Sequence, residues 1–149
     1  MAIINTCGIL LIDKFNKILI AHPTNASWKT WSVPKGKMDK GETYLQTAKR
    51  EFLEESGIDI DTLKGKWYEL GMEVYSTKRK QIYGFALKLD HEVTQEPFCA
   101  SMVENSNPPF PECDAYKWVN FEDFIKLTHH TQVNLLKTYL DTTGEIVYD

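Results

Sequence analysis

The stretch GKMDKGETYLQTAKREFLEESGI, residues 36–58, guides the interpretation of the whole chain. Its second half predicts a helix, because Thr43 and Gln46 have the spacing of a capping box and Gly57 is the residue type favoured just past a helix end. Apolar residues recur along this segment at spacings of three and four, which gives the predicted helix one apolar side. We therefore expect a helix from residue 43 to residue 57 whose apolar side faces a core.

The other side of this helix is acidic. Glu51, Glu54 and Glu55 lie three and four positions apart and should project together, at a cost of about 0.2 to 0.5 kcal/mol for each like-charged pair. Arg50 can offset only part of this charge. Oxygen ligands without His or Cys suit a hard divalent cation, Mg²⁺ or Mn²⁺, which leaves coordination positions for phosphate oxygens. The pattern thus predicts metal-dependent phosphate chemistry, against the alternative of a solvated acidic helix face.

The loop before the helix has the opposite character. Gly36 lies within it, and Lys35, Lys37 and Lys40 are close by, so the loop can present backbone amides and ammonium groups to anions. Because this loop leads directly into the acidic helix, an anion site and a cation site are expected side by side. That combination argues against a merely solvated surface.

The segment closely resembles the Nudix box, Gx5Ex7REUxEExGU with U a bulky apolar residue, which marks hydrolases of a nucleoside diphosphate linked to another moiety. The matching residues are Gly36, Glu42, Arg50, Glu51, Phe52, Glu54, Glu55, Gly57 and Ile58. Phe52 departs from the usual aliphatic residue, which affects packing more than chemistry. The resemblance implies a mixed α/β (α+β) fold, a Nudix-type α/β/α sandwich around a mixed β-sheet.

The resemblance also implies roles for individual residues. The implied metal ligands are Gly36, Glu51, Glu54 and Glu55, and the implied catalytic residues are Glu51, Arg50, Glu54 and Glu112. Arg50 would orient Glu51, Glu42 would support the metal, and a carboxylate would take the proton of an attacking water.

The general base is left open between Glu51 and Glu112. The string that begins at Glu112 resembles the E-H-x-A-Y-R-W stretch of Nudix hydrolases of diadenosine tetraphosphate, with Cys113 in place of His and Lys117 in place of Arg. The alternative for Glu112 is an exposed loop acid.

Substrate preference rests on a second partial likeness. The run Trp31 to Gly36 contains P-K-G, which resembles the dinucleoside polyphosphate enzymes more than the enzymes that remove oxidised nucleotides. The predicted substrate-binding residues are Lys35, Lys37, Arg79, Tyr83 and Tyr116. The tyrosines would stack on bases and the cations would hold phosphates, although the basic stretch 78–80 also fits ordinary charge on a turn.

The resemblance therefore implies a metal-dependent pyrophosphohydrolase of dinucleoside polyphosphates such as diadenosine tetraphosphate. Rival substrates are ADP-ribose, nucleotide sugars, NADH and the 5′ cap of RNA, because the motif fixes the reaction and not the leaving group. A non-catalytic nucleotide-binding module is a further alternative, but such modules typically lose box glutamates that are all present here. The number of metals and the oligomeric state are left open.

Composition bounds the remaining classes. The chain has 149 residues with a net charge of −4, which predicts one domain over residues 1–149 and argues against general neutralisation of nucleic-acid phosphates. Its three cysteines form no C-x-x-C pair, which fits a reducing compartment. We find no signal peptide and no apolar run of about 20 residues, so we expect a soluble, cytoplasmic protein without a membrane partner.

The pattern elsewhere predicts strands, loops and two more helices. We expect strands over residues 3–12, 18–22, 31–33, 67–76, 81–89 and 116–119, the first two forming a hairpin. Residues 35–41 and 90–111 are predicted to be loops, because they hold Gly, Pro and polar residues with little periodicity. Asn120 should cap a short helix that runs through Leu127, and Val133 to Leu140 mark a terminal helix.

Overall fold

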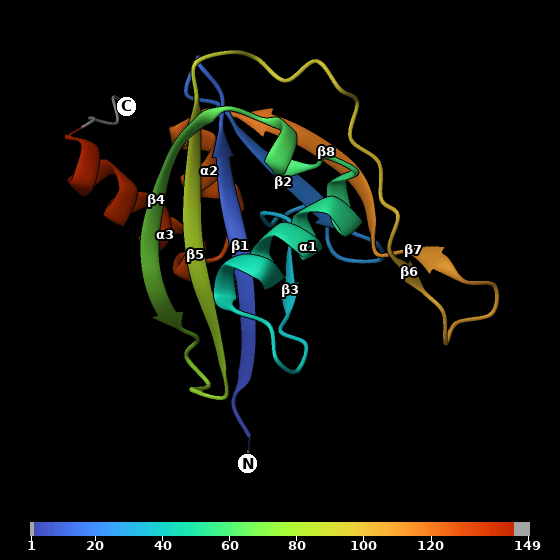
Figure 1. Ribbon diagram of the computed structural model, residues 1–149. Coiled ribbons are helices and arrows are strands. Elements are labelled where there is room, and N and C mark those ends of the chain that lie inside the picture. The colour runs from blue at the N-terminus through green and yellow to red at the C-terminus, as the bar shows by residue number, and fades with distance from the viewer. Residues whose placement is uncertain (1, 145–149) are drawn as a thin grey trace.

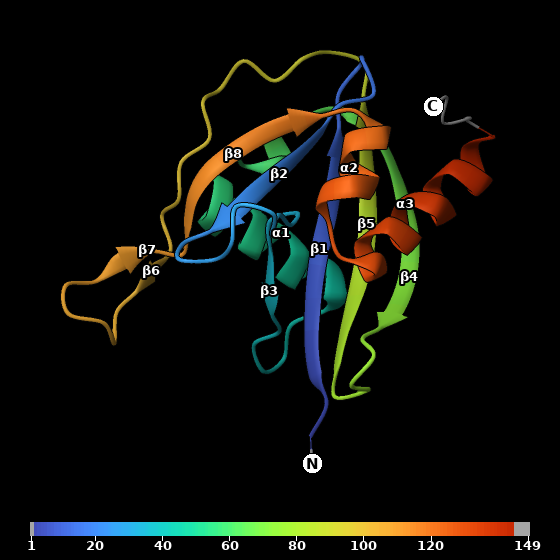
Figure 2. The same ribbon diagram turned by 180° about the vertical axis from the view of Figure 1, so that it is seen from behind.

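A mixed β-sheet lies between α1 on one face and α2 with α3 on the other, as the two opposite views in Figures 1 and 2 show. The computed structural model describes residues 2–144. The mixed α/β class and the three layers predicted from the sequence are therefore confirmed. The extent of a single domain over residues 1–149 stays a prediction.

The elements in chain order are β1 (Ile4–Ile12), β2 (Ile18–Pro23), β3 (Lys35–Lys37), α1 (Tyr44–Ser56), a 3-10 turn η1 (Ile60–Thr62), β4 (Gly65–Val74), β5 (Lys80–Leu89), β6 (Met102–Val103), β7 (Phe110–Pro111), β8 (Cys113–Val119), α2 (Phe121–Leu127) and α3 (His130–Thr143). Within the described residues, no helix is both long enough and apolar enough to cross a membrane.

The long strands of the sheet follow the order β4-β5-β1-β2-β8. β1 runs parallel to β5, whereas the β1–β2, β2–β8 and β4–β5 pairs are antiparallel. The short strand β3 pairs with the first half of β1, where Gly36 lies opposite Cys7. This pairing holds residues 35–37 beside α1, which the chain enters seven residues later.

The predicted helix 43–57 is confirmed as α1. The Thr43 side chain accepts a hydrogen bond from the Gln46 backbone, and the Gln46 side chain accepts one from the Thr43 backbone, so the capping box is complete. Gly57 ends the helix in the left-handed conformation, with φ of 70°. A Cβ at Gly57 would lie 2.3 Å from the Phe98 ring, so glycine is required there for contact as well as for conformation.

Two apolar clusters fill the space between the layers. On the α1 face, Ala48 and Phe52 are fully buried against β1 and β5, as the spacing of the apolar residues predicts. On the opposite face, Leu135 and Tyr139 of α3 are buried in the second cluster, where α3 packs against β4, β5 and α2. α1 therefore has one side fixed in the core, and its acidic side faces β3, where Glu51 lies against Gly36 and Glu55 against Lys35.

Several predicted elements are confirmed with shifted ends. The hairpin of β1 and β2, the antiparallel pair of β4 and β5, α2 and α3 are all present. The Asn120 side chain accepts a hydrogen bond from the Asp123 backbone and caps α2 as expected. Lys80 belongs to β5 rather than to the preceding turn, and β8 begins at Cys113 rather than at Tyr116.

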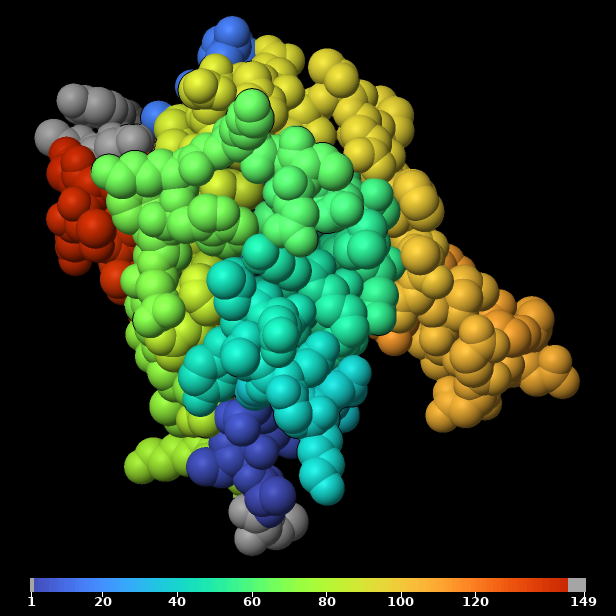
Figure 3. All heavy atoms as spheres, in the orientation of Figure 1, coloured from blue at the N-terminus to red at the C-terminus, as the bar shows by residue number. Residues whose placement is uncertain are grey.

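Three sequence predictions, one strand and two loops, are wrong. Residues 31–33 form no strand, because Trp31 and Ser32 make only isolated bridges and the Val33 N–H donates to the Gln132 side chain instead. The predicted loops 35–41 and 90–111 contain β3 and the small β6–β7 hairpin, respectively. That hairpin projects from the body of the molecule (Figure 3).

Candidate functional site

A cavity of about 360 Å³ lies where β3, α1 and the start of β8 meet β1 and β5. We call it the carboxylate cavity. It is lined by Thr6, Lys35, Gly36, Lys37, Glu51, Glu55, Lys80 and Glu112. Three carboxylates and three ammonium groups thus share one cavity, so both a cation and an anion find partners there.

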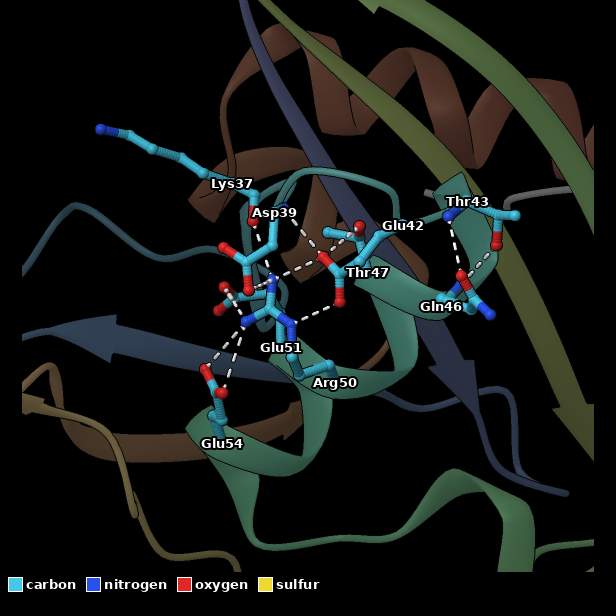
Figure 4. A network of polar contacts seen from close by, with 9 residues as sticks. All are labelled: Lys37, Asp39, Glu42, Thr43, Gln46, Thr47, Arg50, Glu51 and Glu54. Carbon is cyan, nitrogen blue, oxygen red and sulfur yellow. Dashed lines mark hydrogen bonds and ion pairs between the residues drawn. The ribbon is translucent and has the colours of Figure 1, made fainter.

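The guanidinium of Arg50 organises the acidic groups beside this cavity (Figure 4). Its Nε donates to Glu42 at 2.7 Å and its Nη1 donates to Glu51 at 2.9 Å and to Glu54 at 3.3 Å. Asp39 adds a fourth carboxylate at 3.4 Å. Because one positive charge faces four negative ones, the cluster keeps an excess of negative charge that another cation would offset.

Burial and like charge act on Glu51 and Glu55, the two glutamates of α1 that line the cavity. Burial raises the pKa of Glu51. The negative charges of Glu54 and Glu112 raise this pKa further, and the hydrogen bond from Arg50 lowers it. Burial raises the pKa of Glu55 to about 8, although the Lys35 backbone N–H lowers it by donating to the carboxylate at 3.2 Å. Both carboxylates are therefore held in surroundings that favour a compensating positive charge.

Two residues of β8 contact Glu55. The Tyr116 hydroxyl donates to the Glu55 backbone carbonyl, and the Cys113 thiol lies 3.7 Å from Oε1 of Glu55. Burial and the neighbouring Glu55 raise the pKa of Cys113, so this residue is a thiol and not a nucleophilic thiolate. Tyr116 thus positions α1 rather than offering its hydroxyl to the cavity.

Gly36 lies directly against Glu51. A Cβ at position 36 would come within 2.0 Å of Cδ of Glu51 and 2.2 Å of its Oε2. Only glycine lets the β3 backbone approach this carboxylate so closely. The Nudix-like glycine thus has a local steric reason in this chain.

We expect Gly36→Ala to lower kcat about a hundredfold, because the new methyl group must displace the Glu51 carboxylate by an ångström or more. Steady-state kinetics on purified protein would measure the effect. Gly41→Ala is the control for replacing a glycine: Gly41 lies between β3 and α1, where a Cβ would meet nothing within 4 Å and only the backbone, at φ of 85°, would be strained. Equal kcat values for the two variants would contradict the role given to the Gly36 contact.

Glu42 is the strongest partner of Arg50. Hydrogen bonds from Arg50 above all, together with those from the Asp39 backbone N–H and the Thr47 hydroxyl, lower the pKa of Glu42 to about 2. Because the folded-state pKa is depressed, the ionised Glu42 stabilises the fold above its ordinary pKa of about 4.3, and this contribution is lost as the pH falls toward 2.

We therefore expect Glu42→Gln to lower the free energy of unfolding more at pH 7 than at pH 3. Urea unfolding of the wild-type protein and the variant at both pH values measures the two differences. A difference of the same size at pH 3 and pH 7 would show that Glu42 does not stabilise the fold through its charge.

The donor set fits a hard divalent cation. Within residues 2–144, no three His, Cys, Asp or Glu side chains converge on one point as a ready ligand set, and Arg50 instead takes oxygens of Glu51 and Glu54. The donors that β3 and α1 offer are carboxylate and backbone oxygens, which suit Mg²⁺ or Mn²⁺. The Glu51 carboxylate fills the space that the missing Cβ of Gly36 leaves, so the carboxylate lies directly against the β3 backbone.

The structure brings together most of the residues that the sequence singled out. Lys35, Gly36, Lys37, Glu51, Glu55 and Glu112 line the carboxylate cavity, and Arg50 and Glu54 are joined to it by hydrogen bonds.

Three predicted substrate residues, Arg79, Tyr83 and Tyr116, lie outside the cavity lining. Arg79 belongs to the turn between β4 and β5. The Tyr83 ring is stacked on Tyr44 at 4.1 Å between centroids, and its hydroxyl donates to Glu69 at 2.7 Å. Tyr83 is thus occupied by contacts within the fold, and its role in substrate binding stays a prediction.

Sequence reasoning missed Thr6 as a lining residue of this site, and it considered Lys80 only as one of three basic residues at a hairpin tip that could reach distal phosphates. The basic run 78–80 predicts a charged turn. The strand register shows that Lys80 of this run lies in β5 opposite Ile4 of β1, at the cavity. Thr6 carries no signal of its own, because its place depends on strands that join it from distant parts of the chain.

Comparisons with known proteins agree with this geometry. The family model described as NUDIX domain matches residues 3–139. A bis(5′-nucleosyl)-tetraphosphatase (asymmetrical) of Sus scrofa is 32% identical over 100 residues, which are 65% of this chain and 60% of that protein. An RNA pyrophosphohydrolase of Pelagibacter ubique is 25% identical over 150 residues, covering 96% of this chain and 92% of the relative.

One solved structure illustrates the similarity of fold. The binary complex of a C. elegans Ap4A hydrolase superposes with a TM-score of 0.70 at 22% identity, covering 95% of this chain and 98% of the other. At this identity the superposition supports the fold alone.

Proposed function

Because the chain belongs to the NUDIX domain family and is a hydrolase of pyrophosphate bonds, we propose that it cleaves dinucleoside polyphosphates such as diadenosine tetraphosphate, using Mg²⁺ or Mn²⁺. One observation carries the proposal: three carboxylates and three lysines line the same cavity. A polyphosphate bridged to a divalent cation presents the complementary charges. The similarity to the tetraphosphatase of Sus scrofa favours this substrate class.

The lysines favour a substrate with several phosphates. Burial lowers the pKa of Lys80, and the neighbouring Lys35 and Lys37 lower it further, so the three ammonium groups repel one another. A chain of phosphates offsets that repulsion by placing negative charge between them. A substrate with a single phosphate would leave most of this repulsion in place.

The chain's own residues divide the work of hydrolysis as follows. Glu51, Glu54, Glu55 and the Gly36 carbonyl would hold the divalent cation, which when bound stabilises negative charge on the phosphate oxygens. Glu51 or Glu112 accepts the proton of the attacking water. Arg50 keeps the Glu51 carboxylate oriented through its 2.9 Å hydrogen bond.

A second candidate is hydrolysis at the 5′ end of RNA. The similarity to the RNA pyrophosphohydrolase of Pelagibacter ubique extends over 96% of this chain, which favours that alternative. ADP-ribose, nucleotide sugars and NADH contain the same pyrophosphate bond and belong in the same comparison. The three free cysteines support action in a reducing compartment such as the cytoplasm.

A substrate panel tests the proposal. Purified protein with Mg²⁺ or Mn²⁺ would be given diadenosine tetraphosphate, ADP-ribose, NADH, 5′-capped RNA and 5′-triphosphorylated RNA, and kcat/KM would be compared. We expect the highest kcat/KM with diadenosine tetraphosphate and no turnover with EDTA. A higher kcat/KM with RNA or ADP-ribose would overturn the substrate assignment, and cleavage in EDTA would overturn the metal dependence.

A further inference from the structure

A second hollow, of about 460 Å³, lies at the opposite end of the sheet. We call it the lysine hollow, because Lys14, Lys64, Lys66 and Lys88 line it together with Asp90. Along the parallel β1–β5 pair, Ile4 is opposite Lys80 of the carboxylate cavity and Ile12 is opposite Lys88. These positions are eight residues apart along β5, so about 26 Å of strand separates the two sites.

The strand register forces two of these lysines together. Lys66 of β4 lies directly opposite Lys88 of β5 in the antiparallel pair. Like charges at directly opposed positions destabilise a sheet, and the other two lysines add charge of the same sign. Among the described residues, none of the four lysines forms an ion pair with a carboxylate.

The Lys88 ammonium group is held by two hydrogen bonds to uncharged acceptors. Its Nζ donates to the Asp13 backbone carbonyl at 2.9 Å and to Oδ1 of Asn16 at 2.6 Å, and both acceptors are uncharged. The Asp13 carboxylate instead accepts the backbone N–H groups of Phe15 and Lys17, each at 2.9 Å. The turn between β1 and β2 thus holds an ammonium group at the hollow, where Asp90 is the one acid among the described lining residues.

We propose that the lysine hollow binds a multiply charged phosphate anion at a site separate from the carboxylate cavity. Four ammonium groups and one carboxylate leave an excess of positive charge in a chain whose net charge is −4. Phosphate oxygens are strong acceptors for the donors that lysine supplies. The proposal is independent of the substrate cleaved in the carboxylate cavity.

Inorganic polyphosphate and the backbone of single-stranded RNA share this phosphate chemistry. Phe15 borders the lysines with 57% of its surface exposed, and Nζ of Lys14 lies 4.9 Å from its ring centroid. Interleaved lysines and exposed aromatic rings are typical of single-strand binding surfaces. The test therefore needs one probe of each kind.

Backbone amide NMR of metal-free protein in EDTA tests the site, with inorganic tripolyphosphate as the first probe. We expect saturable shifts of the amides of residues 14, 64–66 and 88–90 at constant ionic strength set with NaCl. The double variant Lys64→Gln/Lys66→Gln should bind at this set of amides at least about tenfold more weakly. The matched double variant Lys29→Gln/Lys137→Gln, which removes the same charge elsewhere, should bind within about twofold of wild type.

Absence of shifts at these amides with both probes, or equal affinity in the Lys64/Lys66 variant, would overturn the proposal. A short single-stranded RNA with a 5′-hydroxyl separates the sources: shifts with RNA identify the phosphodiester backbone as a ligand, and shifts with tripolyphosphate alone identify a small polyphosphate.

Stability without anion provides an additional check. Lys66→Gln removes the repulsion with Lys88 and also the contact of Nζ of Lys66 with the Tyr68 ring, 5.3 Å from its centroid, so the check is the dependence of Tm on salt. Raising the NaCl concentration in EDTA should raise the Tm of wild type more than that of Lys66→Gln, because salt screens the repulsion. An equal dependence of the two Tm values on salt would contradict the like-charge argument.

Discussion

Replacement of Glu51 by Gln is expected to lower kcat by a factor of about a hundred to ten thousand. Glu51 is 8% exposed, faces Gly36 without an intervening side chain and accepts a hydrogen bond from Arg50. An amide keeps the shape and can still accept that hydrogen bond, but it neither holds a dication with a full charge nor takes a proton from water. The loss should therefore appear in turnover and not in folding.

Kinetics and thermal unfolding of the same samples separate the two effects. Since burial and neighbouring acids raise the pKa of Glu51, a neutral side chain should leave the Tm in EDTA unchanged or slightly higher. Glu122→Gln is the matched control, because Glu122 lies on α2 and contacts Lys126 rather than the carboxylate cavity. Turnover of Glu51→Gln equal to that of the control would remove Glu51 from the chemistry.

Replacement of Arg50 by Ala is expected to lower the free energy of unfolding in EDTA by about 2 kcal/mol. The reason is that the loss of one guanidinium leaves Glu42, Glu51 and Glu54 without their shared partner. The value lies below that for a fully buried pair, because the Arg50 side chain is 28% exposed and solvent screens part of the repulsion.

Urea unfolding with and without Mg²⁺ measures this effect. A divalent cation should restore part of the lost stability, since it supplies positive charge to the same carboxylates. Lys49→Ala is a control on the same helix, with an expected loss of about 1 kcal/mol or less, because Lys49 pairs with the exposed Asp61 at 2.8 Å and lies 5.6 Å from the centroid of the Trp67 ring, away from the carboxylate cavity. The same stability loss for Arg50→Ala in EDTA and in Mg²⁺ would show that the cation does not act on this cluster.

The part of the site that lies on α1 could be predicted from the sequence, because its determinants are local. A capping box, a terminal glycine and the spacing of three glutamates fix the start, the end and the outward side of one helix. The position of Arg50 among the acids follows from the same spacing. No information from distant residues is needed for these features.

The parts that depend on strand pairing could not be predicted. β3 pairs over only three residues, and its exposed Lys37 and central glycine give no strand pattern. Residues 31–33 are predicted to form a strand, yet Ser32 pairs with Ala21 alone, the Trp31 N–H donates to the Leu127 carbonyl, and the Val33 N–H donates to a side chain of α3. Lys80 joins the cavity because β5 runs parallel to β1, a contact between segments more than 70 residues apart that single-sequence periodicity does not encode.

The central claim is that the acidic side of α1 binds a hard divalent cation, and direct titration with Mn²⁺ tests it most simply. Free Mn²⁺ would be followed by electron paramagnetic resonance for the wild-type protein, the double variant Glu51→Gln/Glu54→Gln and the control Glu122→Gln. We expect saturable binding by the wild-type protein and the control, and at least about tenfold weaker binding by the double variant. Equal affinity in all three proteins, or no binding by the wild-type protein, would contradict the claim.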